Sequence, residues 1–216
     1  MNELSEADRK HYEHYRIPLS MLEGRVLRVD DREARHDYKI YWHDTSVDLG
    51  GLLYLYHDPN TGGRVYWRLR PDTAPKDKEG KGAKYLSPTR GQARRRLYFP
   101  PDAKPWLLDA AVPIVFVESE QSALACTAAA WRSDRCILFV GTGGCTGWMG
   151  KNDDGESAPL SDFGYFNLIK RETTIWFDGD VRSNPNVRDA RRRLAVFLAE
   201  CKATVKIAEV KRDCKV

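Results

Sequence analysis

The chain has 216 residues, of which 42% are hydrophobic and 31% charged, so it can bury a hydrophobic core as one domain or two small ones. A net charge of +4 and an isoelectric point near 8.7 permit nucleic-acid binding without requiring it. The five cysteines include no C-x-x-C pair, and no histidines stand at zinc-finger spacing. This pattern argues against a structural zinc site and against a disulfide framework.

The sequence carries no visible targeting or membrane signal. Its first eight residues are acidic and contain no apolar segment of the kind that a signal peptide needs. No apolar run approaches the roughly 20 residues of a membrane span. We therefore expect a cytoplasmic protein without a membrane partner.

Residues 1–110 are expected to form a small, basic α+β subdomain at the N-terminus. Short strands are predicted at 37–42 and 51–56, and a return strand at 64–70. The segment 57–63 contains Pro and Gly residues that supply the φ values of a turn, so it predicts a hairpin.

Residues 111–216 alternate between apolar strands and helices. Strands are predicted at 113–117, 136–140, 174–177 and 203–210, and helices at about 120–132 and 185–201. Nearly continuous apolar strands that alternate with helices are typical of a parallel sheet covered on both faces. The expected fold class is therefore α/β, with the second domain at 111–216.

Carboxylates follow two of these strands. Asp178 and Asp180 follow one strand with a glycine between them, and Glu118 follows another. Residues i and i+2 of a strand point to the same side, roughly 6.5–7 Å apart, and a carboxylate cluster is costly unless a cation neutralises it. Oxygen ligands favour Mg²⁺ or Mn²⁺. Acids at strand ends also serve as loop and cap residues, so the pattern alone leaves both readings open.

A glycine-rich loop, Gly141–Gly147, follows the strand at 136–140. It matches neither the Walker pattern nor G-x-G-x-x-G. A tight passage from strand to loop is the favoured interpretation. A backbone contact between a phosphate and Gly143 or Gly144 is the alternative.

The segment from Lys84 to Arg96 is basic and has tyrosines beside it. Side chains of this kind suit phosphate contact and base stacking, and the candidates are Lys84, Tyr85, Arg90, Arg94, Arg95 and Arg96. The sequence therefore predicts a nucleic-acid or nucleotide contact here. His11 and His14, three residues apart on an expected helix, have no evident third ligand and are expected at the surface.

Two motifs together resemble a known family. Val115 to Ala125 (VFVESEQSALA) and Trp176 to Asp180 (WFDGD) look like the Toprim domain of DnaG-type primases, topoisomerases and some nucleases. Lys84 to Pro88 (KYLSP), followed by Arg96 to Tyr98 (RLY), is similar to the segment before Toprim in these primases. The closest likeness is to the Toprim-like modules of phage and plasmid replication proteins.

The resemblance implies a Toprim-like parallel sheet and a role for each candidate residue. Glu118 would be a general acid/base or a metal-linked ligand, and Asp178 and Asp180 would hold Mg²⁺. Lys84, Arg94, Arg95 and Arg96 would steer the template strand or nucleotide phosphates, and Gly143 and Gly144 would shape the floor of the site. The implied partners are single-stranded DNA, nucleotides and a replicative helicase, since such modules are often joined to helicases.

The expected function is that of a DNA primase, a nucleotidyltransferase that makes short primers on single-stranded DNA with Mg²⁺ or Mn²⁺. One alternative is a metal-dependent Toprim nuclease that uses the same acids with water as the attacking group. Another is a non-catalytic nucleic-acid-binding module of a replication complex. Ser119 and Ser122 favour this last alternative, because primases carry a glycine and an acid at these positions.

Overall fold

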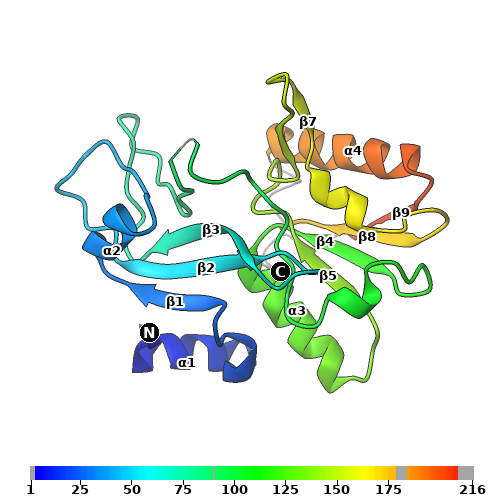
Figure 1. The fold of residues 1–216 in the computed structure, drawn as a ribbon, viewed down its shortest axis with the longest axis horizontal. Helices are drawn as coiled ribbons and strands as arrows, with labels where there is room; N and C mark the ends of the chain where they lie inside the picture. The colour runs from blue at the N-terminus through cyan, green and yellow to red at the C-terminus, as the bar shows by residue number, and fades with distance from the viewer. Residues whose placement is uncertain (1–2, 90, 179–183, 209–216) are drawn as a thin grey trace. The chain divides into compact units, whose positions relative to one another are not determined.

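The computed structural model describes residues 3–89, 91–178 and 184–208 (Figure 1). The chain forms two compact units, Met1–Arg94 and Arg95–Val216. This division lies earlier than the boundary expected at residue 110. Residues 95–110 belong to the second unit because Leu97 and Phe99 are buried in its core and the backbone of Tyr98 pairs with Gly141.

The first unit contains a three-stranded antiparallel sheet. Its strands, in the order β1-β2-β3, are β1 (Val26–Val29), β2 (Gly51–His57) and β3 (Arg64–Pro71). The helices of the unit are α1 (Glu6–His14), the single 3-10 turn η1 (Leu19–Met21) and α2 (Asp31–His36). The hairpin predicted around residues 57–63 is confirmed as the β2–β3 connection.

The strand predicted at 37–42 is wrong. A capping box starts α2 just upstream: Asp30 Oδ1 accepts from the Glu33 N–H at 2.8 Å, and Glu33 Oε2 accepts from the Asp30 N–H at 3.0 Å. Lys39 then has a φ of +52°, which an extended strand does not allow. Only an isolated bridge from Ile40 to Pro88 remains.

The two faces of this sheet are covered differently. Leu53, Leu55 and Leu69 lie on one face in an apolar cluster that includes Ala34 of α2. The other face meets α1 through polar pairs that join Asp8 to Arg28, His11 to Arg70, and the hydroxyls of Tyr12 and Tyr54, the last 3.0 Å apart. Charged and hydrogen-bonded pairs thus join α1 to the sheet, together with the fully buried ring of Tyr12.

The attachment of α1 should be sensitive to acid. Burial opposes ionisation of Asp8, but hydrogen bonds from Arg28 and Ser5 outweigh it and lower the pKa of the carboxyl below 3.8. Such a contact stabilises the fold above about pH 4 and is lost as the pH falls through the lowered pKa. Asp8→Asn should therefore reduce the free energy of unfolding by roughly 2 kcal/mol at pH 7. In urea titrations this deficit should shrink as the pH falls below about 4; a deficit that does not change with pH would contradict the assignment.

The second unit is built on a four-stranded parallel sheet in the order β5-β4-β8-β9. The strands are β4 (Ile114–Val117), β5 (Leu138–Gly141), β8 (Glu172–Trp176) and β9 (Thr204–Ile207), and the helices are α3 (Glu120–Arg132) and α4 (Pro185–Glu200). The unit also has two 3-10 turns, η2 (Lys104–Trp106) and η3 (Ser161–Tyr165), and a small hairpin of β6 (Met149–Lys151) and β7 (Ser157–Pro159). The expected α/β class, with a parallel sheet flanked by helices, is confirmed.

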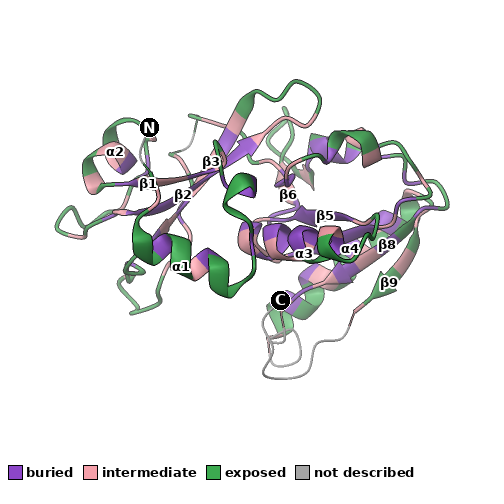
Figure 2. Cartoon of the chain, turned by 90° about the horizontal axis from the view of Figure 1, so that it is seen from below, coloured by how far each residue is buried: buried purple, intermediate pink, exposed green. Residues whose placement is uncertain are grey.

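The helices α3 and α4 cover opposite faces of this sheet (Figure 1). The chain passes from β4 through α3 to β5 on one side and from β8 through α4 to β9 on the other. Crossovers between parallel strands are right-handed, so crossovers that move in opposite directions place their helices on opposite faces. Phe116 and Ile175 of the sheet share an apolar cluster with Leu194 of α4, and Figure 2 shows β5 buried and β9 more exposed.

A buried arginine connects the backbone before β4 with the start of β8. Arg171 is fully buried, and its guanidinium donates to the carbonyls of Val112 at 2.7 Å, Leu107 at 2.5 Å and Trp106 at 2.6 Å. Burial lowers the pKa of this guanidinium to about 10. The side chain thus holds the segment before β4 against the start of β8.

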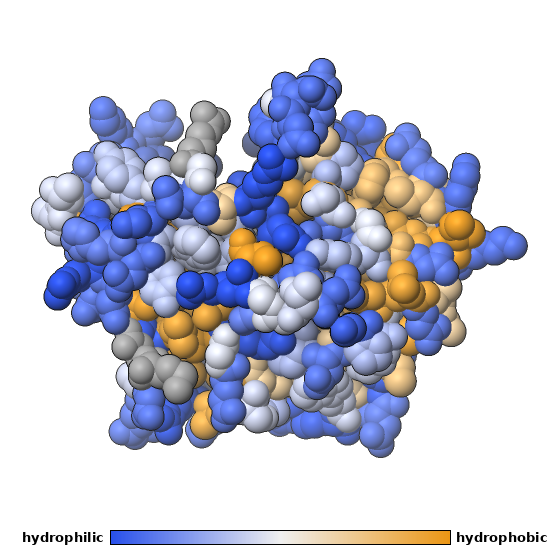
Figure 3. Space-filling model, in the orientation of Figure 1, coloured by the Kyte–Doolittle hydropathy of each residue, from blue (hydrophilic) through white to orange (hydrophobic). Residues whose placement is uncertain are grey.

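Exposed apolar residues occur beside this arginine. Leu108 follows its partner Leu107, Ile169 lies two positions before Arg171 itself, and both are among the most exposed large apolar side chains. Figure 3 shows hydrophobic residues on the surface at the right of the view. In the part of the chain that the structure describes, none of the helices is both long and apolar enough to cross a lipid bilayer.

Candidate active site at the carboxyl edge of the parallel sheet

The strand order places the switch point of the sheet between β4 and β8. These two strands are direct neighbours, with Val117 opposite Trp176, and the crossovers that follow them run in opposite directions. In open α/β sheets, ligands bind beyond the carboxyl ends of the strands at such a point. Glu118 comes directly after β4, and Asp178 comes two residues after β8.

Glu118 and Asp178 are in contact across the switch point. The backbone N–H of Asp178 donates to Oε1 of Glu118 at 3.0 Å. Both residues are half-buried. The hydrogen bond orients the Glu118 carboxylate against the backbone of Asp178, so the two strand ends meet at this point.

The donor set suits a hard divalent cation. Carboxylate oxygens are the ligands that Mg²⁺ and Mn²⁺ prefer, and Mg²⁺ often takes only one or two protein carboxylates and completes its shell with water and substrate phosphates. Asp180, the third predicted ligand, lies outside the described residues. Within the described ranges, no group of three or more His, Cys, Asp or Glu side chains could hold a metal ion. Glu118 and Asp178 therefore fit as a partial ligand pair.

The serines that follow Glu118 have a structural role. Ser119 is the N-cap of α3: its Oγ accepts from the backbone N–H of Ser122 at 3.0 Å and lies 2.7 Å from the Ser122 hydroxyl. N-cap serines satisfy backbone donors that a helix leaves unpaired. The cap fixes the start of α3 immediately after Glu118.

The glycine-rich loop is hydrogen-bonded to the backbone at the carboxyl end of β4. The N–H of Gly144 donates to the Glu118 carbonyl at 2.6 Å, and Oγ1 of Thr142 donates to the Val117 carbonyl at 3.1 Å. Gly143 and Gly144 have φ values of +69° and +106°, which favour glycine. The structure thus brings Gly144, with its neighbour Gly143, to the backbone of Glu118 and shows a tight passage from strand to loop.

Gly147 is the position of the loop that tolerates a side chain least. A Cβ there would lie 1.9 Å from the Thr142 carbonyl oxygen, whereas a Cβ on Gly164 of η3 would meet no atom within 4 Å. Gly147→Ala should therefore lower the free energy of unfolding by about 3 kcal/mol. Gly164→Ala, the matched control, should change it by less than about 0.5 kcal/mol. Equal melting curves for the two variants would show that the loop is not packed as described.

Part of the predicted basic set belongs to the first unit. Lys84 and Arg94 are exposed. The half-buried Tyr85 ring lies 4.6 Å from the Arg68 guanidinium and 5.7 Å from Nζ of Lys84. This tyrosine already takes part in cation–π contacts within its own unit. Arg90 lies outside the described residues.

The other two arginines belong to the second unit and differ from each other. Arg95 is exposed, and its Nη1 donates to the Met149 carbonyl at 3.4 Å. Arg96 is paired with Asp162, with 2.6 Å between Nε and Oδ1, and it donates to the Tyr165 hydroxyl at 2.8 Å. Burial disfavours the charge of Arg96, but the Asp162 carboxylate outweighs it and raises the pKa of the guanidinium. Arg96 therefore has a structural contact that the sequence did not reveal.

Asp162 is the residue of this region that sequence reasoning missed. Its side chain is only 1% exposed, and its Oδ2 also accepts from the backbone N–H of Leu97 at 2.6 Å. No local pattern marks it, because its partners lie 65 and 66 positions away in the sequence.

Removal of the Asp162 carboxylate should be strongly destabilising. Asp162→Ala would leave Arg96 half-buried without its partner, which costs roughly 3–5 kcal/mol in such sites. Asp189, an exposed acid of α4 that pairs with Arg192 and Arg193, provides the control. Thermal melts should show a large loss for Asp162→Ala and almost none for Asp189→Asn. A melting temperature unchanged by Asp162→Ala would show that the buried pair does not hold this segment.

Comparisons with known proteins place the second unit in a family. The family described as a domain of unknown function (DUF3854) matches residues 105–215, just over half of the chain. The matched range includes Glu118, Asp178 and all four strands of the parallel sheet. No curated protein and no solved structure matches the chain.

Proposed function

The chain belongs to the family of the domain of unknown function DUF3854, and we propose that it is a primase-type nucleotidyltransferase that makes short primers on single-stranded DNA with Mg²⁺ or Mn²⁺. The observation that carries the proposal is the contact of Glu118 with Asp178 at the β4–β8 switch point. Two carboxylates at this point, beside a glycine loop, suit phosphate chemistry that needs a cation. The Toprim-like spacing of the two acid motifs supports the same reading.

Each residue has a stated part in this reaction. Asp178, with Glu118 and Asp180, would hold the cation, which would neutralise charge on the phosphate oxygens and orient the reacting groups when bound. A ribose 3′-hydroxyl attacks the α-phosphorus of a nucleotide, a new P–O bond forms, and the bond to pyrophosphate breaks. Glu118 accepts the hydroxyl proton, since the backbone N–H of Asp178 orients its carboxylate. Positioning and charge neutralisation supply most of the rate enhancement in such transfers.

The basic side chains would bind the template electrostatically. Lys84, Arg94 and Arg95 are exposed, and phosphate contacts by exposed cations add affinity that falls as salt rises. Arg96 has a structural role in place of a template contact, because its charge is paired with Asp162. It holds the segment that carries Arg95.

The proposal is tested by incubating the protein with single-stranded DNA, labelled nucleotides and Mn²⁺. Asp178→Asn and Glu118→Gln should each lower primer synthesis by at least about 100-fold, because each removes a charge from the site. Asp189→Asn should leave synthesis unchanged, and excess EDTA should abolish it. Full activity in folded Asp178→Asn would overturn the metal site.

The same assay separates the alternative functions. Shortened template in place of primers would favour a Toprim-type nuclease, in which water attacks instead of the 3′-hydroxyl. A gel shift of DNA with neither product would favour a non-catalytic binding module of a replication complex.

A further inference from the structure

Aromatic side chains gather on one face of the antiparallel sheet in the first unit. Tyr38 and Trp67 pack, half-buried, against the apolar cluster that contains Leu53, Leu55 and Leu69. Their rings meet edge to face, with the centroids 6.2 Å apart. Neither residue has a part in the proposed reaction, so this surface is considered for a separate contact.

A shift in strand register turns Arg64 toward these rings. At the end of β2 the pairing with β3 shifts by one residue, so that Arg64 stands opposite His57. Opposite residues of neighbouring strands point to the same face, and His57 shares its face with Leu55, two residues earlier. The Arg64 guanidinium accordingly lies 5.6 Å from the centroid of the Tyr38 ring and 5.7 Å from that of the Trp67 ring.

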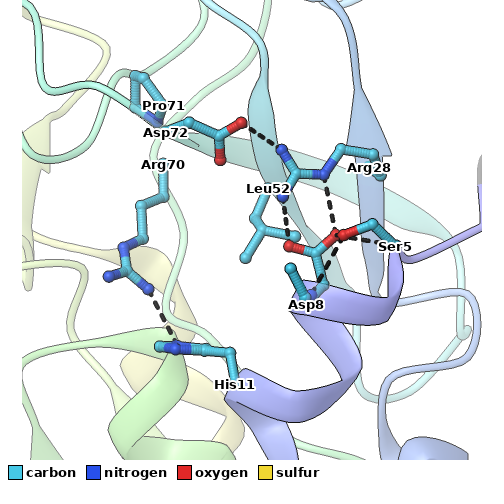
Figure 4. Close-up of a pocket in the computed structure, with 9 residues that line it drawn as sticks. Ser5, Asp8, His11, Arg28, Leu52, Arg70, Pro71 and Asp72 are labelled. Atoms are coloured by element: carbon cyan, nitrogen blue, oxygen red, sulfur yellow. Dashed lines mark hydrogen bonds and ion pairs between the residues drawn. The ribbon is translucent and has the colours of Figure 1, made fainter.

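The charge of Arg64 is not matched by an acid. Its side chain is exposed, and it forms no ion pair with the residues that the structure describes. The same holds for the exposed Lys39. On the opposite face of the sheet, by contrast, Arg28 is bonded to both Asp8 and Asp72 (Figure 4). The face with the aromatic rings therefore offers positive charge to an anionic ligand.

The backbone beside these rings is held in place and presents a further aromatic ring. Nε1 of Trp67 donates to the Tyr38 carbonyl at 2.7 Å. The Lys39 carbonyl accepts from the backbone N–H of Thr89 at 2.9 Å and from its hydroxyl at 2.6 Å. Tyr41 follows and is 66% exposed, and its ring contacts no other aromatic ring in the described part of the chain. An ordered segment thus leaves one aromatic ring open to a ligand.

We propose that this aromatic surface, defined by Tyr38, Tyr41, Arg64 and Trp67, binds single-stranded DNA by base stacking. Unpaired bases stack on aromatic rings and on the planes of guanidinium groups, and a guanidinium also binds phosphate oxygens. One base stacks on the outer side of the Arg64 guanidinium and another on the Tyr41 ring, with Lys39 near the phosphates. A chain of bases and phosphates matches both the rings and the charge, whereas a polyanion without bases matches the charge alone.

The test is fluorescence anisotropy of a labelled oligothymidylate titrated with the full chain in EDTA. An abasic oligonucleotide of equal length should bind at least about fivefold more weakly, because it offers no base to stack. Tyr41→Ala should weaken oligothymidylate binding at least about fivefold without changing its salt dependence, whereas Tyr41→Phe should bind normally. Arg64→Gln should weaken binding and also lower the slope of log affinity against log salt by about one.

Two exposed residues of α1 provide matched controls. Tyr15→Ala removes another exposed tyrosine, and Lys10→Gln removes an exposed cation that is paired with Glu6 at 2.7 Å. Neither change should alter the affinity or its salt dependence. Tyr41 and Arg64 are themselves exposed, so their variants should keep the melting curve of the unmodified protein.

The proposal rests on the proposed function only for the choice of DNA as the ligand, and the two can fail separately. Asp178→Asn should bind oligothymidylate normally whether or not the protein makes primers. Normal binding by folded Tyr41→Ala and Arg64→Gln would overturn the aromatic surface even if primers are made, and equal binding of the abasic oligonucleotide would do the same. Tighter binding of oligouridylate than of oligothymidylate would overturn the choice of DNA. No binding of any oligonucleotide would overturn the proposal in favour of a protein partner.

Discussion

The parallel pairing of β4 with β8 is the constraint on which the second unit depends. Because the crossover from β4 and the crossover from β8 run in opposite directions, α3 and α4 cover opposite faces of the sheet. That arrangement leaves the edge beyond β4 and β8 uncovered by either connection, and it brings Glu118 into hydrogen-bond contact with Asp178 across 60 residues of sequence. The glycine loop and the Ser119 cap then fix the backbone on either side of Glu118.

Arginine has three separate uses in this chain. Arg171 is buried and bonded to backbone carbonyls, and Arg96 is held by a buried carboxylate, so both stabilise the fold. Arg28 is bonded to two acids and helps to hold α1. In the proposed function, exposed residues such as Arg95 are the ones that would contact nucleic acid. A basic composition alone therefore overstates the positive charge that is available to a partner.

The parts of the fold that follow from local pattern could be predicted from sequence. The apolar runs predicted the strands of the parallel sheet. The helical spacing of apolar residues predicted the ends of α3 and α4 to within one residue. The strand predicted at residues 37–42 does not form, because a capping box and a positive φ at Lys39 override the strand propensity of the aromatic residues there. Asp162 and the His11–Arg70 contact could not be predicted, since each depends on a partner more than 55 positions away. The candidate acids were found because their strand-end positions are a local feature, and the pairing of their strands brought them together.

The central claim is that Glu118 and Asp178 form part of one cation site. Titration of Mn²⁺ into the protein, followed by electron paramagnetic resonance of the free ion, measures this site without any reaction. We expect one tight Mn²⁺ site that Glu118→Gln and Asp178→Asn each weaken at least tenfold, while Asp189→Asn does not. Equal Mn²⁺ affinity in all four proteins would contradict the account.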